Sequence, residues 1–160
     1  MEEKREISDF VWWVIPNKLL GVRKPENEVE VAYLKSIGVG GVVTLLDDEE
    51  NHKLYVATDM DFLWTPMKGG TAPEVDQVIE ASEFISDINS KGKAVAIHCN
   101  NGRKRTGTML AAQLVRQGMD GDQAIYRIQE LNHEAQLNDL QKDFYTTLTS
   151  RIHAFSRCKL

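Results

Sequence analysis

Residues 94–115 read AVAIHCNNGRKRTGTMLAAQLV, and this stretch decides the fold. Its first four residues form an apolar run that is typical of a buried strand, and the residues after Thr106 have the apolar spacing of an amphipathic helix. Cys99 lies in the short loop between them. A strand, a tight loop and a helix N-terminus place this thiol beneath backbone N–H groups and the positive end of a helix dipole, which together form an anion site.

The residue types in this loop point to phosphoryl transfer to sulfur. A thiolate at such a site is stabilised and stays nucleophilic at neutral pH. Arg105 follows Cys99 by six positions, so the five residues between them can wrap a phosphate while the guanidinium binds two of its oxygens, a geometry that Lys cannot provide. The predicted chemistry is attack of Cys99 on phosphorus, which gives a phosphocysteine that water then hydrolyses.

Other residues of the loop have predicted supporting roles. Thr106 is expected to donate its hydroxyl to the sulfur, to cap the helix, or both. His98 is expected to hydrogen-bond the loop backbone and to lower the pKa of the thiol, and the alternative is a core histidine with no such role. Arg103 and Lys104 either face the phosphate or are outward-facing charges. The predicted phosphate-binding residues are Asn100, Asn101, Gly102, Arg103, Lys104 and Arg105.

The loop from His98 to Gly107 resembles the signature loop of the cysteine-dependent protein tyrosine phosphatase superfamily, on its small atypical dual-specificity side. Residues 13–21 resemble the opening strands of those phosphatases, and residues 34–45 resemble a helix end that leads into a core strand. The resemblance implies an α/β fold with a central, mostly parallel sheet flanked by helices. It also implies hydrolysis of phosphate monoesters of the phosphotyrosine or dual-specificity type, with no metal and no cofactor.

The sequence departs from that family at the general acid. Most members carry an Asp shortly after a Trp-Pro or similar pair, whereas this chain reads Trp64-Thr65-Pro66-Met67, with Met67 in the place of the Asp. A missing acid costs a factor of about 10² to 10⁴ in rate. Either another carboxylate replaces it, or the leaving group needs no acid, or the protein binds phosphate and turns over poorly. The candidate carboxylates are Asp76, Glu74, Asp47 and Asp48.

Three alternatives to a phosphotyrosine or dual-specificity phosphatase stay open. The extra charge of Arg103 and Lys104 is similar to that of the Cys-Asn-x-Gly-Lys-His-Arg-Thr-Gly loop in plant and fungal atypical phosphatases, which act on inositol pyrophosphates. This likeness implies inositol polyphosphates, pyrophosphates or another polyanionic phosphate as substrate. The absent Asp favours a low-activity, phosphate-binding pseudophosphatase. Sulfur transfer of the rhodanese type is the third alternative, since it also uses a cysteine loop at a helix N-terminus.

Length and composition bound the remaining possibilities. With 160 residues, 42% of them hydrophobic and 27% charged, the chain is expected to form one domain over residues 10–160 after a flexible lead-in at residues 1–9. A net charge of −5 argues against general nucleic-acid binding. No apolar run reaches the length of a membrane span. Only two cysteines predict a reducing, cytoplasmic compartment. The expected partner is a phosphorylated protein or a small polyanionic phosphate, and we expect a monomer.

The apolar pattern predicts strands that alternate with helices, and therefore a layered α/β domain with a largely parallel central sheet. Residues 10–22 are expected to form a hairpin or two short strands with the turn at Pro16 and Asn17. Further strands are predicted at residues 41–46, 61–66 and 94–97. Helices are predicted from Pro25 to Gly38 and at residues 73–89, 105–117, 121–131 and 138–155.

Overall fold

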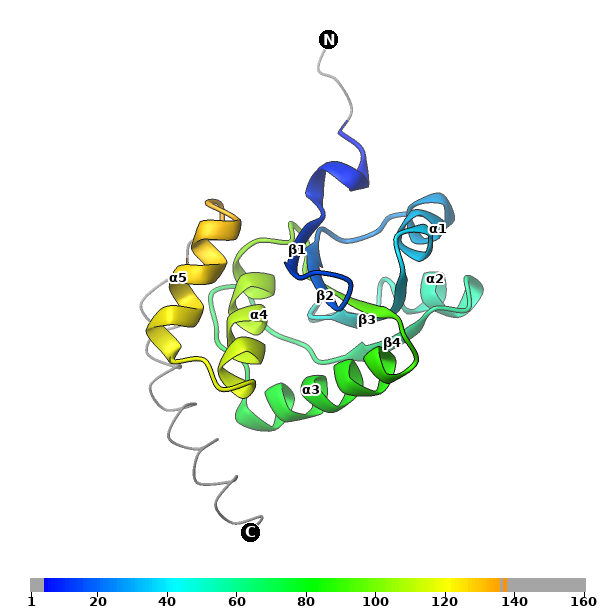
Figure 1. The fold of residues 1–160 in the computed structure, drawn as a ribbon. Coiled ribbons are helices and arrows are strands. Elements are labelled where there is room, and N and C mark those ends of the chain that lie inside the picture. The colour runs from blue at the N-terminus through cyan, green and yellow to red at the C-terminus, as the bar shows by residue number, and fades with distance from the viewer. Residues whose placement is uncertain (1–4, 136, 138–160) are drawn as a thin grey trace.

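The computed structural model describes residues 5–135 and residue 137. In this part of the chain a five-stranded sheet lies between helices (Figure 1). The strands, in their order across the sheet, are β1 (Trp12–Ile15), β2 (Leu19–Val22), β5 (Ala94–His98), β3 (Val39–Thr44) and β4 (Asp61–Trp64). β1 runs antiparallel to β2, and every other neighbouring pair is parallel. The predicted α/β fold with a mostly parallel sheet is therefore confirmed.

β5 is the central strand of the sheet, because it pairs with β2 on one edge and with β3 on the other. Ala96 lies opposite Leu20 of β2 and opposite Val42 of β3. All residues of β5 are buried. This burial explains the unbroken apolar run in the sequence, because a parallel strand with both faces covered shows no polar alternation.

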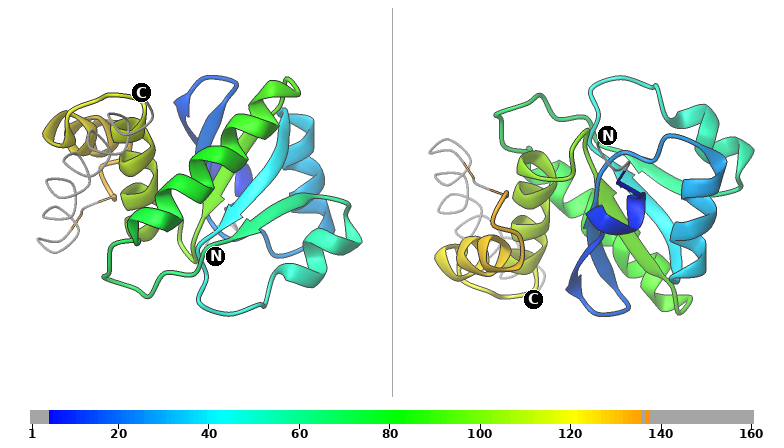
Figure 2. Two further views of the ribbon diagram at one scale, coloured as in Figure 1. Left: turned by 90° about the horizontal axis from the view of Figure 1, so that it is seen from below. Right: turned by 90° about the horizontal axis from the view of Figure 1, so that it is seen from above.

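Helices cover both faces of the sheet (Figure 2). α1 (Glu28–Ser36) and α2 (His52–Ala57) lie on one face, and α3 (Val75–Ser90) and α4 (Lys104–Arg116) lie on the other. The core is split accordingly, so that Val95 and Ile97 of β5 pack towards α3 and α4 while Ala94 and Ala96 belong to the cluster under α1 and α2. α5 (Gly121–Leu131) packs mainly against α4.

The N-terminal segment contains the predicted hairpin. Its turn includes Asn17, which has a φ of +64°, a conformation that Asn tolerates better than most residues. Before the hairpin, Ile7–Phe10 forms a short 3-10 helix, η1. Ile7 is 4% exposed and belongs to the core cluster under α1. Part of the segment expected to be a flexible lead-in therefore packs against the domain.

Neither of the short helices η1 and α2 was predicted from the sequence. α2 has only six residues, too few to show a helical repeat of apolar positions. It nevertheless contributes Tyr55, which is fully buried. The fourth strand ends at Trp64, earlier than predicted, because Thr65 and Pro66 already belong to the following loop. The helix predicted at residues 138–155 lies outside the described residues.

The parallel strands all end at one edge of the sheet, and the loops that follow them meet there. These loops are residues 23–27 after β2, 45–51 after β3, 65–74 after β4 and 99–103 after β5. The carboxyl edge of a parallel sheet is where α/β proteins place their binding sites. Among the described residues, no helix is both long and apolar enough to cross a membrane.

Candidate active site

Cys99 lies at the base of a pocket at this edge of the sheet. It follows the last residue of β5, and its side chain is mostly buried, with the residue 4% exposed. The pocket has a volume of about 360 Å³. It is lined by Gly69, Gly70, Cys99, Asn100, Asn101, Arg103, Lys104 and Arg105. The structure thus brings together Cys99 and most of the residues that the sequence assigned to phosphate binding.

The surroundings of Cys99 favour the thiolate. Burial raises the pKa of the thiol, but hydrogen bonds to the sulfur outweigh this effect and lower the pKa below its usual value. The Thr106 hydroxyl donates to Sγ at 3.2 Å. The backbone N–H groups of Thr106, Arg103 and Gly102 lower the pKa as well. Because these donors stabilise the charged form of the sulfur, they favour the nucleophilic thiolate over the neutral thiol.

The loop that carries Cys99 needs glycine at position 102. Gly102 has a φ of +72°, and a Cβ atom there would lie 2.4 Å from the carbonyl carbon and oxygen of Val22. Two hydrogen bonds hold the loop on either side of this contact. The Trp12 indole N–H donates to the Gly102 carbonyl at 3.1 Å, and the Lys24 N–H donates to the Asn100 carbonyl at 3.1 Å. The loop is therefore fixed by the hairpin and by the residues after β2.

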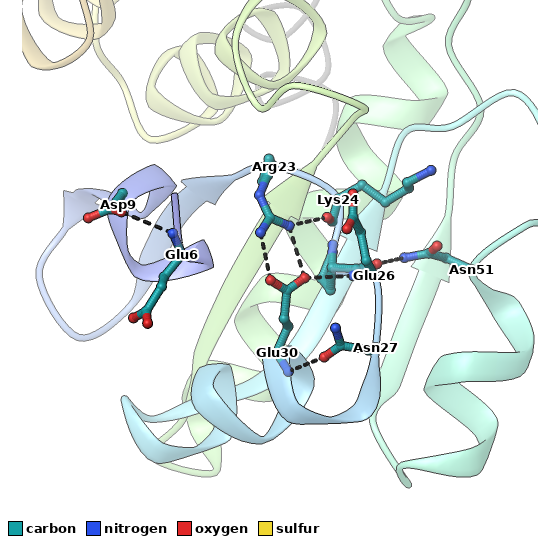
Figure 3. Close-up of polar contacts among 9 residues, drawn as sticks. Glu6, Asp9, Arg23, Lys24, Glu26, Asn27, Glu30 and Asn51 are labelled. Atoms are coloured by element: carbon teal, nitrogen blue, oxygen red, sulfur yellow. Dashed lines mark hydrogen bonds and ion pairs between the residues drawn. The ribbon is translucent and has the colours of Figure 1, made fainter. Parts of the chain in front are cut away.

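A partly buried ion pair braces the segment after β2 (Figure 3). The Arg23 guanidinium donates to both carboxylate oxygens of Glu30, at 2.9 and 2.6 Å, and both side chains are 14% exposed. Arg23 also donates to the Lys24 carbonyl at 2.8 Å, while Glu30 accepts from the Glu26 N–H at 2.9 Å. Bidentate pairs of this kind fix both distance and angle. This ion pair thus holds the segment after β2 in place. The Lys24 N–H of that segment in turn donates to the Asn100 carbonyl of the loop.

His98 supports the loop from below and does not line the pocket. Its Nδ1–H donates to the Cys99 carbonyl at 3.0 Å, and its Nε2 accepts from the Tyr55 hydroxyl at 2.6 Å. The Asn51 amide donates to that hydroxyl at 3.0 Å. Burial, together with the charges of Lys24 and Arg105, outweighs the hydrogen bond to the Cys99 carbonyl and lowers the pKa of His98 to about 4, so the imidazole is neutral at pH 7. Burial likewise raises the pKa of Tyr55.

Sequence reasoning placed His98 correctly beside the loop backbone but missed Tyr55 and Asn51. Both belong to the segment around α2, which showed no helical pattern. The only available signal was a polar pair, Asn51 and Tyr55, separated by four residues, which places both on the same face of a helix.

The three basic residues of the loop have different partners. Arg105 donates from Nη1 to the Met67 carbonyl at 2.8 Å. Arg103 forms an ion pair with Glu134, with 2.9 Å between Nε and Oε2. Lys104 is exposed and begins α4. All three line the pocket, while Lys104 is also exposed to solvent and Arg103 is 42% exposed.

The four carboxylates considered as general acids do not line the pocket. Glu74 caps α3 in a reciprocal arrangement with Gln77, and Asp76 lies in the first turn of that helix. Asp48 accepts a hydrogen bond from the Glu50 N–H, and Asp47 is exposed. Met67 itself is buried in the core, so only its backbone reaches Arg105. Among residues 5–135 and 137, no cluster of His, Cys, Asp and Glu side chains is arranged to hold a metal ion.

Comparison with known proteins defines the class to which this fold and site belong. Residues 21–119 match the family model described as "Polymorphic toxin system, DSP-PTPase phosphatase". The chain belongs to this family of cysteine-based phosphatases, on its small atypical dual-specificity side.

Individual relatives agree with this assignment. The chain is 32% identical over 112 residues to the phosphatidylglycerophosphate phosphatase PTPMT2 of Arabidopsis thaliana. The aligned region covers 68% of this chain and 49% of that protein. It is 31% identical over 112 residues to PTPMT1 of the same plant, covering 68% and 33%. The chain thus spans half the length of these curated relatives or less.

Solved structures share the fold. A crystal structure of PTPMT1 superposes with a TM-score of 0.81 at 19% identity, covering 92% of this chain and 99% of that one. Tk-PTP in its active form superposes with a TM-score of 0.79 at 25% identity, covering 88% and 97%.

Proposed function

We propose that this chain hydrolyses phosphate monoesters through a phosphocysteine at Cys99, without a metal. The thiolate attacks phosphorus, so that an S–P bond forms while the P–O bond to the leaving group breaks. The departing alkoxide takes a proton from solvent and leaves as the alcohol, because none of the four candidate carboxylates lines the pocket. Water then attacks the phosphocysteine, which releases inorganic phosphate, restores the thiolate and gives a proton to solvent. The observation that carries the proposal is the buried Cys99 sulfur, with its lowered pKa, beside Arg105 at the base of one pocket.

Each neighbouring group has a part in this reaction. Arg105 leaves the Met67 carbonyl and binds two phosphate oxygens, where its planar fork provides two parallel hydrogen bonds. The backbone N–H groups of Gly102 and Arg103 stabilise the developing charge as preorganised donors. Thr106, already bound to Sγ, stabilises the thiolate as it departs in the second step.

The proposed substrate is a small polyanionic phosphate. Arg103, Lys104 and Arg105 line the pocket, and among residues 5–135 and 137 its lining includes neither a carboxylate nor an aromatic ring that would hold a phosphotyrosine side chain. The curated relatives are named for phosphatidylglycerophosphate, a lipid whose headgroup carries two phosphates. A polyphosphorylated inositol likewise carries several phosphates on a small headgroup, whereas a phosphotyrosine peptide presents a single phosphate on an aromatic ring.

Two measurements test the proposal. Turnover of para-nitrophenyl phosphate should disappear in Cys99→Ser, and acid quenching of the wild-type reaction should trap phosphate on Cys99. Turnover that survives Cys99→Ser would contradict the mechanism. The substrate is tested by kcat/KM for a phosphotyrosine peptide, for the soluble headgroup of phosphatidylglycerophosphate and for an inositol pyrophosphate. A preference of more than tenfold for the peptide would contradict the polyanion.

A further inference from the structure

A second, smaller pocket adjoins the first, and we call it the side pocket. It has a volume of about 230 Å³, room for several water molecules at about 30 Å³ each. Arg5, Asp9 and Trp12 from the N-terminal segment form one wall, and Glu134 from the turn after α5 forms another. Asn101 and Arg103 line both the side pocket and the pocket above Cys99. The two hollows are therefore neighbours that share one edge of the signature loop.

Arg103 stands between the two pockets and is held there by Glu134. The ion pair measures 2.9 Å, and its side chains are 42% and 61% exposed. Exposed pairs of this kind contribute little to stability, so another anion can replace the carboxylate at small cost. A phosphate offers Arg103 two parallel hydrogen bonds in exchange. Glu134 thus occupies the place that an anionic part of a substrate would take.

The position of Glu134 is set by the fold. Its N–H binds the Asn132 side chain at 3.0 Å, and the Ala135 N–H binds the Asn132 carbonyl at 3.0 Å. Ala135 is fully buried, and its Cβ lies 3.1 Å from where a Cβ on Gly107 would stand. The turn is therefore packed onto the start of α4, directly after the signature loop, and it presents the carboxylate to Arg103.

Besides Arg103 and Glu134, two charged side chains line the side pocket, Asp9 and Arg5. Asp9 is engaged in η1, where its carboxylate accepts from the Glu6 N–H at 3.1 Å (Figure 3). The guanidinium of Arg5 lies over the Phe10 ring, 4.5 Å from its centroid. Arg5 and Arg103 line this pocket together with the carboxylates of Asp9 and Glu134, so an anionic group that displaces Glu134 would meet two guanidinium groups and one remaining carboxylate there.

We propose that the side pocket binds a second phosphate of the substrate and that Glu134 competes with this phosphate for Arg103. The inference rests on the proposed function, because the reacting phosphate must occupy the pocket above Cys99. A monophosphate leaves the Arg103–Glu134 pair intact. A bisphosphate with a short spacer displaces Glu134, so Arg103 and Glu134 set the preference for substrates that carry two phosphates.

A matched pair of substrates tests this proposal. Propyl phosphate and propane-1,3-diol bisphosphate have the same type of leaving group and differ in the second phosphate. The measured quantity is the ratio of their kcat/KM values, bisphosphate over monophosphate, from release of inorganic phosphate. Glu134→Gln should raise the ratio about two- to fivefold, the factor that corresponds to a surface ion pair. Arg103→Ala should lower it about tenfold, as expected for a lost charge-assisted contact.

Two controls separate this effect from general electrostatics. Glu130→Gln removes the same charge from an exposed position on α5 that lines neither pocket, and it should leave the ratio unchanged. In the Arg103→Ala background, Glu134→Gln should have no further effect, because the two residues act through one contact. A rise of the ratio by the same factor in Glu130→Gln, or in the double variant, would overturn the proposal.

The outcomes also distinguish this inference from the function on which it rests. Loss of both activities in Cys99→Ser, together with an unchanged ratio in Glu134→Gln and Arg103→Ala, would support the phosphatase mechanism and reject the side pocket. Turnover that does not depend on Cys99 would reject both.

Discussion

The Arg105 guanidinium donates a hydrogen bond from Nη1 to the backbone carbonyl of Met67, at 2.8 Å. Arg105 lies in the first turn of α4, and Met67 lies in the loop after β4. The loop in which relatives carry their acid is thus tied through its backbone to the residue proposed to bind phosphate. In the proposed reaction Arg105 leaves this carbonyl for the phosphate, so we expect the position of the loop to depend on whether the pocket is occupied.

Replacing Arg105 by Lys tests the role of its planar fork. Lys keeps the charge but cannot make two parallel hydrogen bonds to a phosphate. We expect Arg105→Lys to lower kcat/KM for para-nitrophenyl phosphate about 10²- to 10³-fold, the usual effect of losing a preorganised donor at the reacting group. Steady-state kinetics measure the loss, and a thermal melt checks that the fold is intact. Activity within a few-fold of wild type would contradict bidentate binding.

The Thr106 hydroxyl is expected to act through the ionisation of Cys99. Thr106→Val keeps the shape of the side chain and removes the donor to Sγ at 3.2 Å. Because that hydrogen bond favours the thiolate, its loss raises the pKa of Cys99. The rate of alkylation by iodoacetamide should then rise at higher pH than in wild type, and kcat should fall about tenfold. The N-cap of α4 is Arg103 and no side-chain capping bond is formed there, so an unchanged pH profile of alkylation would contradict this role of Thr106.

Gly102 and Gly92 form a matched pair for testing the shape of the loop. Both have positive φ, +72° and +78°, but a Cβ would clash with Val22 only at Gly102, while at Gly92 nothing lies within 4 Å. Gly92→Ala should cost about 1 kcal/mol of unfolding free energy through strain alone and leave activity unchanged. Gly102→Ala should cost about 1–3 kcal/mol and lower kcat/KM more than a hundredfold. Urea unfolding and steady-state kinetics measure both effects, and equal activities would contradict the argument.

The buried His98 makes the stability of the protein depend on pH. Its pKa is lowered to about 4 in the folded protein, against about 6.5 in an unfolded chain. Between these values the unfolded chain binds more protons, so the free energy of unfolding rises with pH across this window. The full contribution, about 3 kcal/mol, is present above pH 6.5 and is lost as the pH falls towards 4.

Urea unfolding between pH 4.5 and 7 measures this effect. His98→Gln is expected to be less stable than wild type at pH 7, because the contact with Tyr55 is changed. Its free energy of unfolding should also change less with pH than that of wild type. Equal slopes for the two proteins would show that other groups cause the pH dependence.

The parts of this molecule that sequence could predict are local. The β5 run, the loop and the apolar face of α4 are consecutive, and their residue types alone specify strand, turn and helix. The long-range contacts were not predictable, because they join segments that are far apart in the chain. Tyr55 reaches His98, and Glu134 reaches Arg103, only once the sheet and helices have packed. The short α2 had too few turns to produce a periodic signal.

The general acid illustrates the same limit. The sequence contains four carboxylates near the relevant loops. Two lie at the start of α3, one accepts a hydrogen bond within a turn and one is exposed to solvent, and none of them lines the pocket. Which side of a loop a side chain faces depends on packing, as with Met67, whose side chain is buried while its carbonyl meets Arg105.

The central position of β5 in the sheet also determines which strands lose their hydrogen bonds in local unfolding. Its amides are hydrogen-bonded between two neighbouring strands, whereas β1 and β4 each have a free edge. Hydrogen exchange at Ala96 should therefore require unfolding of the whole domain, while the outer strands exchange through smaller, local openings. The proposed nucleophile Cys99 directly follows the strand that we expect to unfold last, so its geometry should survive local opening of the outer strands.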